Sequence, residues 1–147
     1  MSEINAIGIS VIIPIYNVEL YIERCVRSLM EQTLENIEFI FVNDCTPDDS
    51  MDILHYVLEE YPKRREQIKI IEHETNRGIS AVRNTGLKNA TGQYIIYCDS
   101  DDWVEKNMYE KLLVKALETS ADIVGCDFFD DYVAHSTIRK QLFPQQS

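Results

Sequence analysis

The stretch ISVIIPIYN, residues 9–17, joins a short apolar run to a polar end. The run from Ile9 to Ile13 is too short for a helix and is mostly β-branched, which is typical of a buried strand. Further runs of this kind follow at Ile37–Val42, Ile68–Ile71, Tyr94–Cys98 and Ile123–Cys126. We therefore predict five short strands.

The segments between these runs carry apolar residues at helical spacing. The first such stripe consists of Ile22, Cys25, Val26, Leu29 and Met30. Further helices are predicted at Ile53–Tyr61, Ser80–Ala90 and Glu105–Thr119, with Asn17 as the cap of the first helix, and with Thr46, Pro47 and Asp49 at the start of the second. Alternating strands and helices imply an α/β fold, with a mainly parallel sheet and helices on both faces.

The 147 residues, 45% of them apolar, are enough for one domain with a substantial core. The strand and helix pattern ends near Asp127, so we predict one domain over residues 1–127. Residues 128–147 are polar and show no periodicity, and we interpret them as a tail or as the start of a further region.

The chain is acidic, with 25 Asp and Glu against 14 Lys and Arg and a net charge of -11. This balance argues against a nucleic-acid partner, because binding through phosphates needs a basic face. No apolar run of about 18 residues and no signal peptide is present, so we predict a cytoplasmic protein. Attachment to the cytoplasmic face of a membrane would need a part that this sequence does not contain. The four cysteines are spaced too widely for a zinc site and are interpreted as free thiols.

Polar side chains follow each of the first four runs. These positions are informative because ligands of open α/β sheets bind outside the carboxyl ends of the strands. The residues concerned are Pro14, Tyr16 and Asn17, then Asn43, Asp44 and Cys45, then His73 and Glu74, and finally Asp99, Ser100, Asp101 and Asp102. The alternative is that each group only forms a cap or a turn, for which Asp and Asn are common.

Asp99 and Asp101 lie two positions apart, so on an extended segment their carboxylates point the same way while Ser100 faces away. Converging carboxylates repel one another unless a proton or cation lies between them. Oxygen ligands of this kind select magnesium, manganese or calcium and leave positions open for the phosphate oxygens of a ligand. The pattern alone is weak, because Asp102 could equally cap the following helix.

Asp44 and Tyr16 suggest a pocket for a nucleobase. A carboxylate at a strand end can accept a hydrogen bond from a ring N–H, and an aromatic ring can stack on the base. The alternative is that Asp44 is a turn residue and Tyr16 ordinary packing. Arg83 could reach a base or phosphate from its predicted helix. A receiver or phosphatase domain is a weaker alternative, because no lysine closely follows the run Ile123–Cys126.

The motifs VIIPIYN, FVNDCTPDDS and NRGISAVRNTGLKNATGQYIIYCDSDD together resemble glycosyltransferase family 2, in order and spacing, over roughly residues 8–127. The resemblance implies a Rossmann-like GT-A fold and inverting transfer of a sugar from a nucleotide diphosphate sugar, most often a UDP-sugar. It also implies a divalent cation, Mn²⁺ or Mg²⁺. The acceptor would be a carbohydrate or lipid-linked hydroxyl.

The resemblance also implies roles for single residues. Pro14, Tyr16 and Asn17 would line the nucleotide, and Asp44 would accept a hydrogen bond from the base. Arg83 would face the nucleotide. Asp99 would lie near the ribose and beside the metal, and Asp101 would be the direct metal ligand. Trp103 is expected to serve in packing.

Two departures from the family pattern matter. The second motif has Asn43, Asp44, Cys45 and Thr46 where the family usually has Asp-Asp-Gly-Ser, which predicts a reshaped loop near the base. The family's general base lies in a later part of the catalytic domain and has no match here. Asp127, Asp130 and Asp131 are interpreted as a solvated loop. The expectation is therefore a GT-A fold truncated on its C-terminal side, or alternatively a nucleotide-binding fragment without turnover.

Overall fold

The computed structural model describes residues 6–126, 128–131 and 136–139. The chain divides into two compact units between Glu110 and Lys111. Within the described part of the chain, no helix combines the length and the apolar character that crossing a membrane requires.

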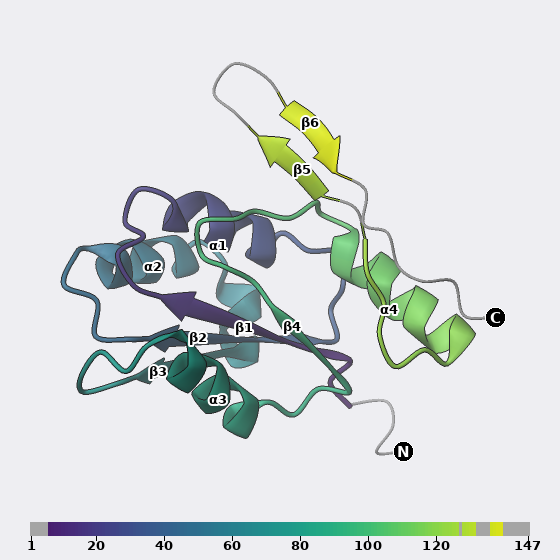
Figure 1. The fold of residues 1–147 in the computed structure, drawn as a ribbon, viewed down its shortest axis with the longest axis horizontal. Coiled ribbons are helices and arrows are strands. Elements are labelled where there is room, and N and C mark those ends of the chain that lie inside the picture. Colours follow the sequence, from purple (N-terminus) through teal and green to yellow (C-terminus); the bar gives the residue numbers. More distant parts are fainter. Residues whose placement is uncertain (1–5, 127, 132–135, 140–147) are drawn as a thin grey trace. The chain divides into compact units, whose positions relative to one another are not determined.

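The first unit is built on a parallel sheet of four strands (Figure 1). The strands are β1 (Ile9–Ile15), β2 (Ile37–Asn43), β3 (Ile68–Glu72) and β4 (Tyr94–Tyr97), arranged in the order β3-β2-β1-β4. Each coincides with a predicted run to within two residues. Ile9 lies opposite Ile37 on one side and Tyr94 on the other, so β1 is a central strand. The prediction of a mainly parallel sheet is confirmed.

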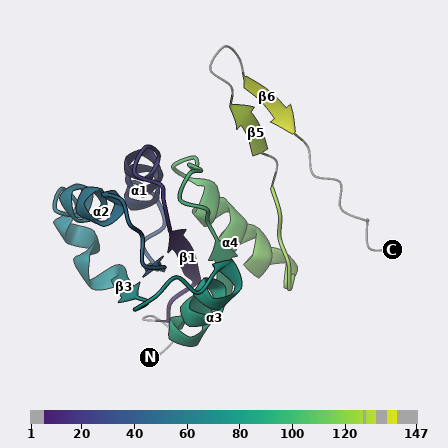
Figure 2. The same cartoon turned by 60° about the vertical axis from the view of Figure 1, so that its left-hand side comes forward.

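Helices cover both faces of this sheet, as predicted. The elements are α1 (Ile22–Met30), α2 (Ser50–Leu58) and α3 (Ile79–Asn89), with a short 3-10 helix, η2 (Pro62–Gln67), that the sequence pattern did not predict. Figure 2 shows α1 and α2 on one side of β1 and α3 on the other. A fourth helix, α4 (Met108–Thr119), begins three residues after the predicted start at Glu105.

The core under α3 shows why this helix lies close to the sheet. Ile12, Ile40 and Val42 are fully buried and pack with Val82 of α3. Residues between them along the strands point to the opposite face, because successive strand side chains alternate. A Cβ atom added to Gly86 would overlap the Ile12 side chain, so the absence of a side chain here lets α3 approach β1.

The predicted helix caps are wrong. Tyr21 precedes the first turn of α1 and Asp49 precedes that of α2, and neither side chain caps its helix. Asn17 instead has φ 53° in the preceding loop, a left-handed conformation that Asn tolerates. The Thr46 hydroxyl donates to Asp48 Oδ1 at 2.6 Å rather than serving a helix end. Asn17 N also donates to Thr46 Oγ1 at 2.9 Å, so hydrogen bonds within and between these loops have replaced the local caps.

The predicted fifth strand, Ile123–Cys126, is also wrong. These residues have no strand conformation, and Ile123 is 84% exposed. A strand needs a neighbouring strand, and no strand pairing in the described part of the chain includes these residues. The second unit instead contains a short antiparallel pair, β5 (Phe128–Asp131) with β6 (Ser136–Arg139), in the region expected to be an unpatterned tail. Asp130 and Asp131 belong to β5, and Asp127 lies outside the described residues.

Candidate nucleotide and metal site

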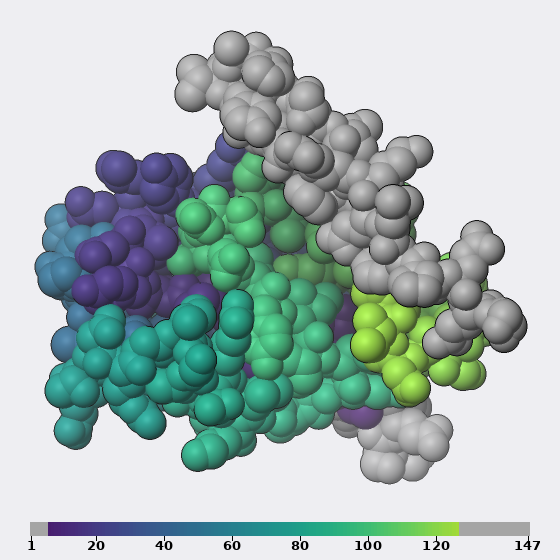
Figure 3. Space-filling model, viewed as in Figure 1, coloured from purple at the N-terminus to yellow at the C-terminus, as the bar shows by residue number. Residues whose placement is uncertain are grey.

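The order in which the strands are added reverses between β1 and β4, the position at which open α/β sheets have their ligand-binding crevice. The chain adds β2 and β3 on one side of β1 and then crosses over to place β4 on the other. At such a reversal the loops that follow the two neighbouring strands diverge, and ligands bind between them. In Figure 3 the purple segment after β1, the green segment after β4 and the teal segment around α3 border one another on one face.

A buried serine fastens the acidic loop to β1. The Ser100 hydroxyl donates to the carbonyl oxygen of Pro14 at 2.6 Å, and Ser100 is only 4% exposed. Asp102 N donates to the carbonyl oxygen of Asp99 at 3.0 Å, which closes a turn. Ser100 is buried while Asp99 and Asp101 are exposed, but these residues lie in a turn and not on the extended segment that was predicted.

The three aspartates of this turn form a cluster that fits a divalent cation. Asp99, Asp101 and Asp102 each offer a carboxylate oxygen, and these atoms lie within 4.8 Å of one another. The pKa of Asp102 is raised, first by partial burial and then by the negative charges of Asp101 and Asp99. A bound divalent cation, which prefers oxygen ligands, would reduce the repulsion between carboxylates crowded in this way.

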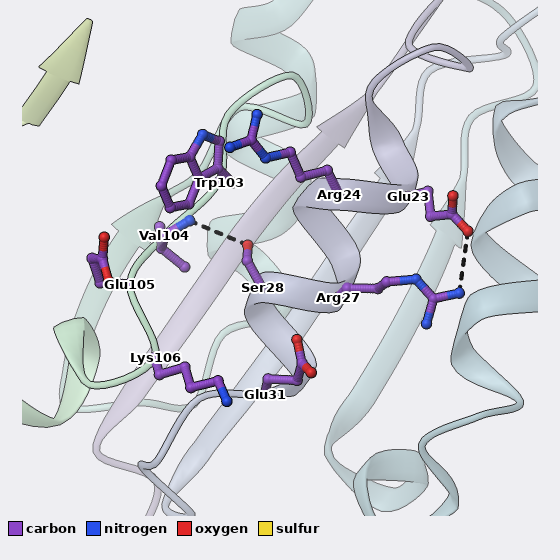
Figure 4. A pocket seen from close by; sticks show the side chains of 9 residues that line it. All are labelled: Glu23, Arg24, Arg27, Ser28, Glu31, Trp103, Val104, Glu105 and Lys106. Carbon is purple, nitrogen blue, oxygen red and sulfur yellow. Dashed lines mark hydrogen bonds and ion pairs between the residues drawn. The ribbon is translucent and has the colours of Figure 1, made fainter. Parts of the chain in front are cut away.

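The segment after the acidic turn is attached to α1. Val104 N donates to Ser28 Oγ at 3.2 Å, and the Gln32 amide donates to the carbonyl oxygen of Glu105 at 2.6 Å. Figure 4 shows the groove beside this attachment, where the Arg24 guanidinium lies 4.3 Å from the centre of the Trp103 ring. The packing role expected for Trp103 agrees with this contact. The segment therefore holds the acidic turn from its C-terminal side.

Asp44 is a buried carboxylate held at the start of α3. Oδ1 accepts from Arg77 N and Oδ2 from Gly78 N, both at 2.9 Å. Burial by itself raises the pKa of Asp44, but the hydrogen bonds from Arg77 N, from His73 and from Gly78 N outweigh it, so the pKa is lowered. Asp44 therefore stays ionised although it is only 3% exposed.

Sequence reasoning noted His73 after the third strand but gave it no role. Its Nδ1 lies 2.9 Å from Asp44 Oδ1, and its Nε2 lies 2.8 Å from the hydroxyl of Thr85 on α3. The usable signal was its position, because it directly follows β3 on the same edge of the sheet as Asp44. Thr85 carried no signal, since a threonine inside a helix is ordinary.

Tyr16 and Arg83 each lie near the end of a sheet strand. Asp44 N donates to the carbonyl oxygen of Ile15 at 3.0 Å, so Asp44 lies beside the residue that precedes Tyr16. The Tyr16 side chain is exposed and available to a planar ligand. The Arg83 guanidinium lies 5.3 Å from the centre of the Tyr97 ring, at the end of β4. The structure thus places the predicted residues along one edge of the sheet.

Asp48, which the sequence analysis overlooked, joins the loops after β1 and β2. Its carboxylate accepts from the Thr46 and Ser50 hydroxyls at 2.6 Å and from Glu19 N at 3.1 Å. Burial acts to raise the pKa of Asp48, but these hydrogen bonds lower it to about 2. Asn17 N donates to Thr46 Oγ1 at 2.9 Å, so Asn17 contributes its backbone to the same network.

Cys45 bears on the expected reshaping of the loop near the base. It has φ 57°, a left-handed conformation that glycine enters without strain. The loop therefore adopts a backbone that the family's usual glycine would also allow.

A parallel sheet in the order 3-2-1-4, with helices on both faces and an acidic turn after β4, defines an α/β protein of the Rossmann-like GT-A class. The family model described as glycosyl transferase family 2 matches residues 10–145. The chain belongs to glycosyltransferase family 2.

Similar sequences and solved structures agree with this family assignment. The chain is 45% identical over 138 residues to the uncharacterized glycosyltransferase EpsJ of Bacillus subtilis, covering 94% of this chain and 38% of EpsJ. It resembles S. aureus TarS in complex with UDP, with a TM-score of 0.69, 32% identity and coverage of 78% of this chain and 33% of that one. It also resembles the mannosyltransferase PcManGT of Pyrobaculum calidifontis with GDP-Man and Mn²⁺, with a TM-score of 0.60, 26% identity and coverage of 65% and 28%. The chain thus spans well under half the length of these proteins.

Proposed function

We propose that this chain forms the donor-binding half of an inverting glycosyltransferase that transfers a sugar from a UDP-sugar to a hydroxyl acceptor. The observation that carries the proposal is the acidic cluster of Asp99, Asp101 and Asp102, fastened by Ser100 to Pro14 at the reversal of the strand order. A nucleotide diphosphate bound across this crevice would have its base near Tyr16 and Asp44 and its phosphates near the acids.

The acceptor positions left on Asp44 favour uracil. A carboxylate oxygen accepts about two hydrogen bonds. Oδ1 accepts from His73 and Arg77 N, whereas among the described residues only Gly78 N donates to Oδ2, which leaves one acceptor position on Oδ2. Uracil presents one ring N–H, whereas guanine presents two adjacent donors and suits a pair of acceptors. The UDP complex of TarS supports this assignment by similarity.

The acidic turn would hold Mn²⁺ or Mg²⁺, with Asp101 as the direct ligand and Asp99 beside the metal and the ribose. When bound, the cation would neutralise the diphosphate leaving group as a Lewis acid. The Mn²⁺ complex of PcManGT supports a divalent cation by similarity. Arg83 would add positive charge on the nucleotide side of the crevice.

The residues assigned above concern the sugar donor, not the acceptor. We assign the acceptor to the class that the family resemblance implies, a carbohydrate or lipid-linked hydroxyl, and no residue of this chain to the role of general base. We place the reaction in the cytoplasm, at a membrane face if the acceptor is lipid-linked. Free Cys25 and Cys98, both buried, are consistent with a reducing compartment.

Isothermal calorimetry with UDP tests the proposal. The chain should bind UDP more tightly with Mn²⁺ than without it, and Asp101→Ala should remove this difference. Glu66→Ala is the matched control, because Glu66 is an exposed carboxylate on η2, away from the acidic turn. Absence of UDP binding in both conditions would overturn the donor assignment, and a metal effect that survives Asp101→Ala would overturn the metal assignment.

A further inference from the structure

His73 is a nearly buried imidazole with both ring nitrogens engaged. Its side chain is 5% exposed, and its backbone N–H donates to the carbonyl oxygen of Asn43 at 2.9 Å, which extends the pairing of β3 with β2. One ring nitrogen contacts Asp44 at the end of β2 and the other contacts Thr85 in α3. The imidazole thus links two strand ends to the helix on that face.

The chemistry of the partners sets the direction of these hydrogen bonds. An ionised carboxylate only accepts, so His73 Nδ1 must carry a hydrogen and donate to Asp44. The Thr85 hydroxyl can donate to Nε2 or accept from it, so it holds the ring in either protonation state. Because the ring is held at both nitrogens, its orientation does not depend on solvent.

The fixed imidazole determines which oxygen of the Asp44 carboxylate remains open as an acceptor. Its two oxygens can exchange places or turn unless each has a fixed donor. Gly78 N and Arg77 N hold one oxygen each, and His73 adds a second donor to Oδ1 alone. The added donor saturates Oδ1 and leaves the open acceptor position on Oδ2.

We infer that His73 is a positioning residue for base recognition: it saturates one oxygen of Asp44, so that a single acceptor remains for the ring N–H of a uracil-type base. This inference rests on the proposed donor function. It adds that the preference for the base depends on a residue that need not touch the nucleotide.

Two amide substitutions separate the two contacts of the ring. The amide nitrogen of His73→Asn lies close to where Nδ1 lies, so this variant keeps a donor for Asp44 and loses Thr85. The amide of His73→Gln reaches the position of Nε2, so this variant keeps Thr85 and loses the donor to Asp44. If His73 only stabilised the fold, the effects of the two substitutions would depend on burial and packing, and the loss of the donor to Asp44 would not make His73→Gln differ from His73→Asn in base preference.

The measurement is calorimetry of the full chain with UDP and with CDP, in Mn²⁺, and the readout is the ratio of the two Kd values. Cytosine has no hydrogen at N3 and keeps only its exocyclic amine as a donor, so the ratio of the two Kd values reports how well Asp44 accepts from a ring N–H. His73→Gln should lower the preference for UDP roughly tenfold, the order expected for one hydrogen bond to a charged group. His73→Asn should stay within about threefold of the wild type.

Urea unfolding of each variant checks that it is folded. A substitution at Thr85, the other partner of the ring, completes the test. Thr85→Val removes only the hydroxyl, and by loosening the ring it should lower the preference about threefold. A wild-type chain that binds no UDP would overturn the proposed function and this inference with it. A wild type that prefers UDP, with variants that all retain the preference or lose it equally, would overturn the inference alone.

Discussion

The Ser100 hydroxyl donates a hydrogen bond of 2.6 Å to the carbonyl oxygen of Pro14, although the two residues are 86 positions apart in the chain. This bond joins the turn after β4 to the end of β1. Ser100 is buried while Asp99 and Asp101 on either side of it are exposed, so the turn presents both aspartates to solvent. One buried hydroxyl therefore couples the end of a core strand to the candidate metal ligands.

Ser100→Ala should weaken both the fold and the metal-dependent binding of UDP. Loss of the donor to Pro14 should lower the free energy of unfolding by about 1–2 kcal/mol. Without this hydrogen bond the acidic turn is no longer held against β1, which should raise the Kd for UDP in the presence of Mn²⁺ several-fold. Thr119→Ala is a control, because Thr119 also donates to a backbone carbonyl, that of Lys115, but on an exposed helix turn. Equal effects of the two substitutions in urea unfolding would contradict the special role of Ser100.

Asp102→Asn should stabilise the metal-free protein. The folded-state pKa of Asp102 is raised, so the folded protein keeps this proton to higher pH than the unfolded chain does, and ionisation of Asp102 lowers stability as the pH rises through that window. At neutral pH the gain should be about 0.5 kcal/mol after allowance for solvent screening. Thermal unfolding without metal measures it. Mn²⁺ should then raise the Tm of the wild type more than that of the variant; an unchanged or lower Tm of metal-free Asp102→Asn would count against mutual repulsion.

Cys45→Gly should stabilise the fold without disturbing the loop. Cys45 has φ 57°, and relief of this strain, less the greater chain entropy of glycine, should amount to about 0.5–1 kcal/mol. Gly78→Ala is the converse test, since Gly78 has φ 90° and a Cβ atom there meets nothing within 4 Å. Its loss of about 1–3 kcal/mol would come from backbone strain alone. Urea unfolding of both variants should give opposite signs.

Asp48→Asn should destabilise the protein in a pH-dependent way. The pKa of Asp48 is about 2 in the folded state against 3.8 ordinarily, so its contribution is present above about pH 4 and is lost as the pH falls toward 2. The variant should be less stable than the wild type by about 1 kcal/mol at pH 6, after discounting for exposure, and the gap should narrow at pH 3. Urea unfolding at both pH values gives the double difference. A gap that is constant with pH would show that shape, and not charge, explains the loss.

Sequence reasoning succeeded where the signal was local and periodic. The runs at β1 to β4 were identified because a buried strand is a short apolar segment, and the helices because their apolar residues repeat at 3.6-residue spacing. It failed at Ile123–Cys126, an apolar run that has no strand neighbour among the described residues, and at the caps of α1 and α2. There, partners from other loops, such as the Thr46 hydroxyl for the backbone N–H of Asn17, competed successfully with local capping.

By itself the sequence determined the α/β class, the four parallel strands and the polar residues at their carboxyl ends. These features follow from chain geometry over a few residues. Only the tertiary structure decided that Ser100 would bond to Pro14 and that His73 would join Asp44 to Thr85. Those contacts depend on the strand order and on the crossover to β4, which bring distant segments together, and no local period encodes them.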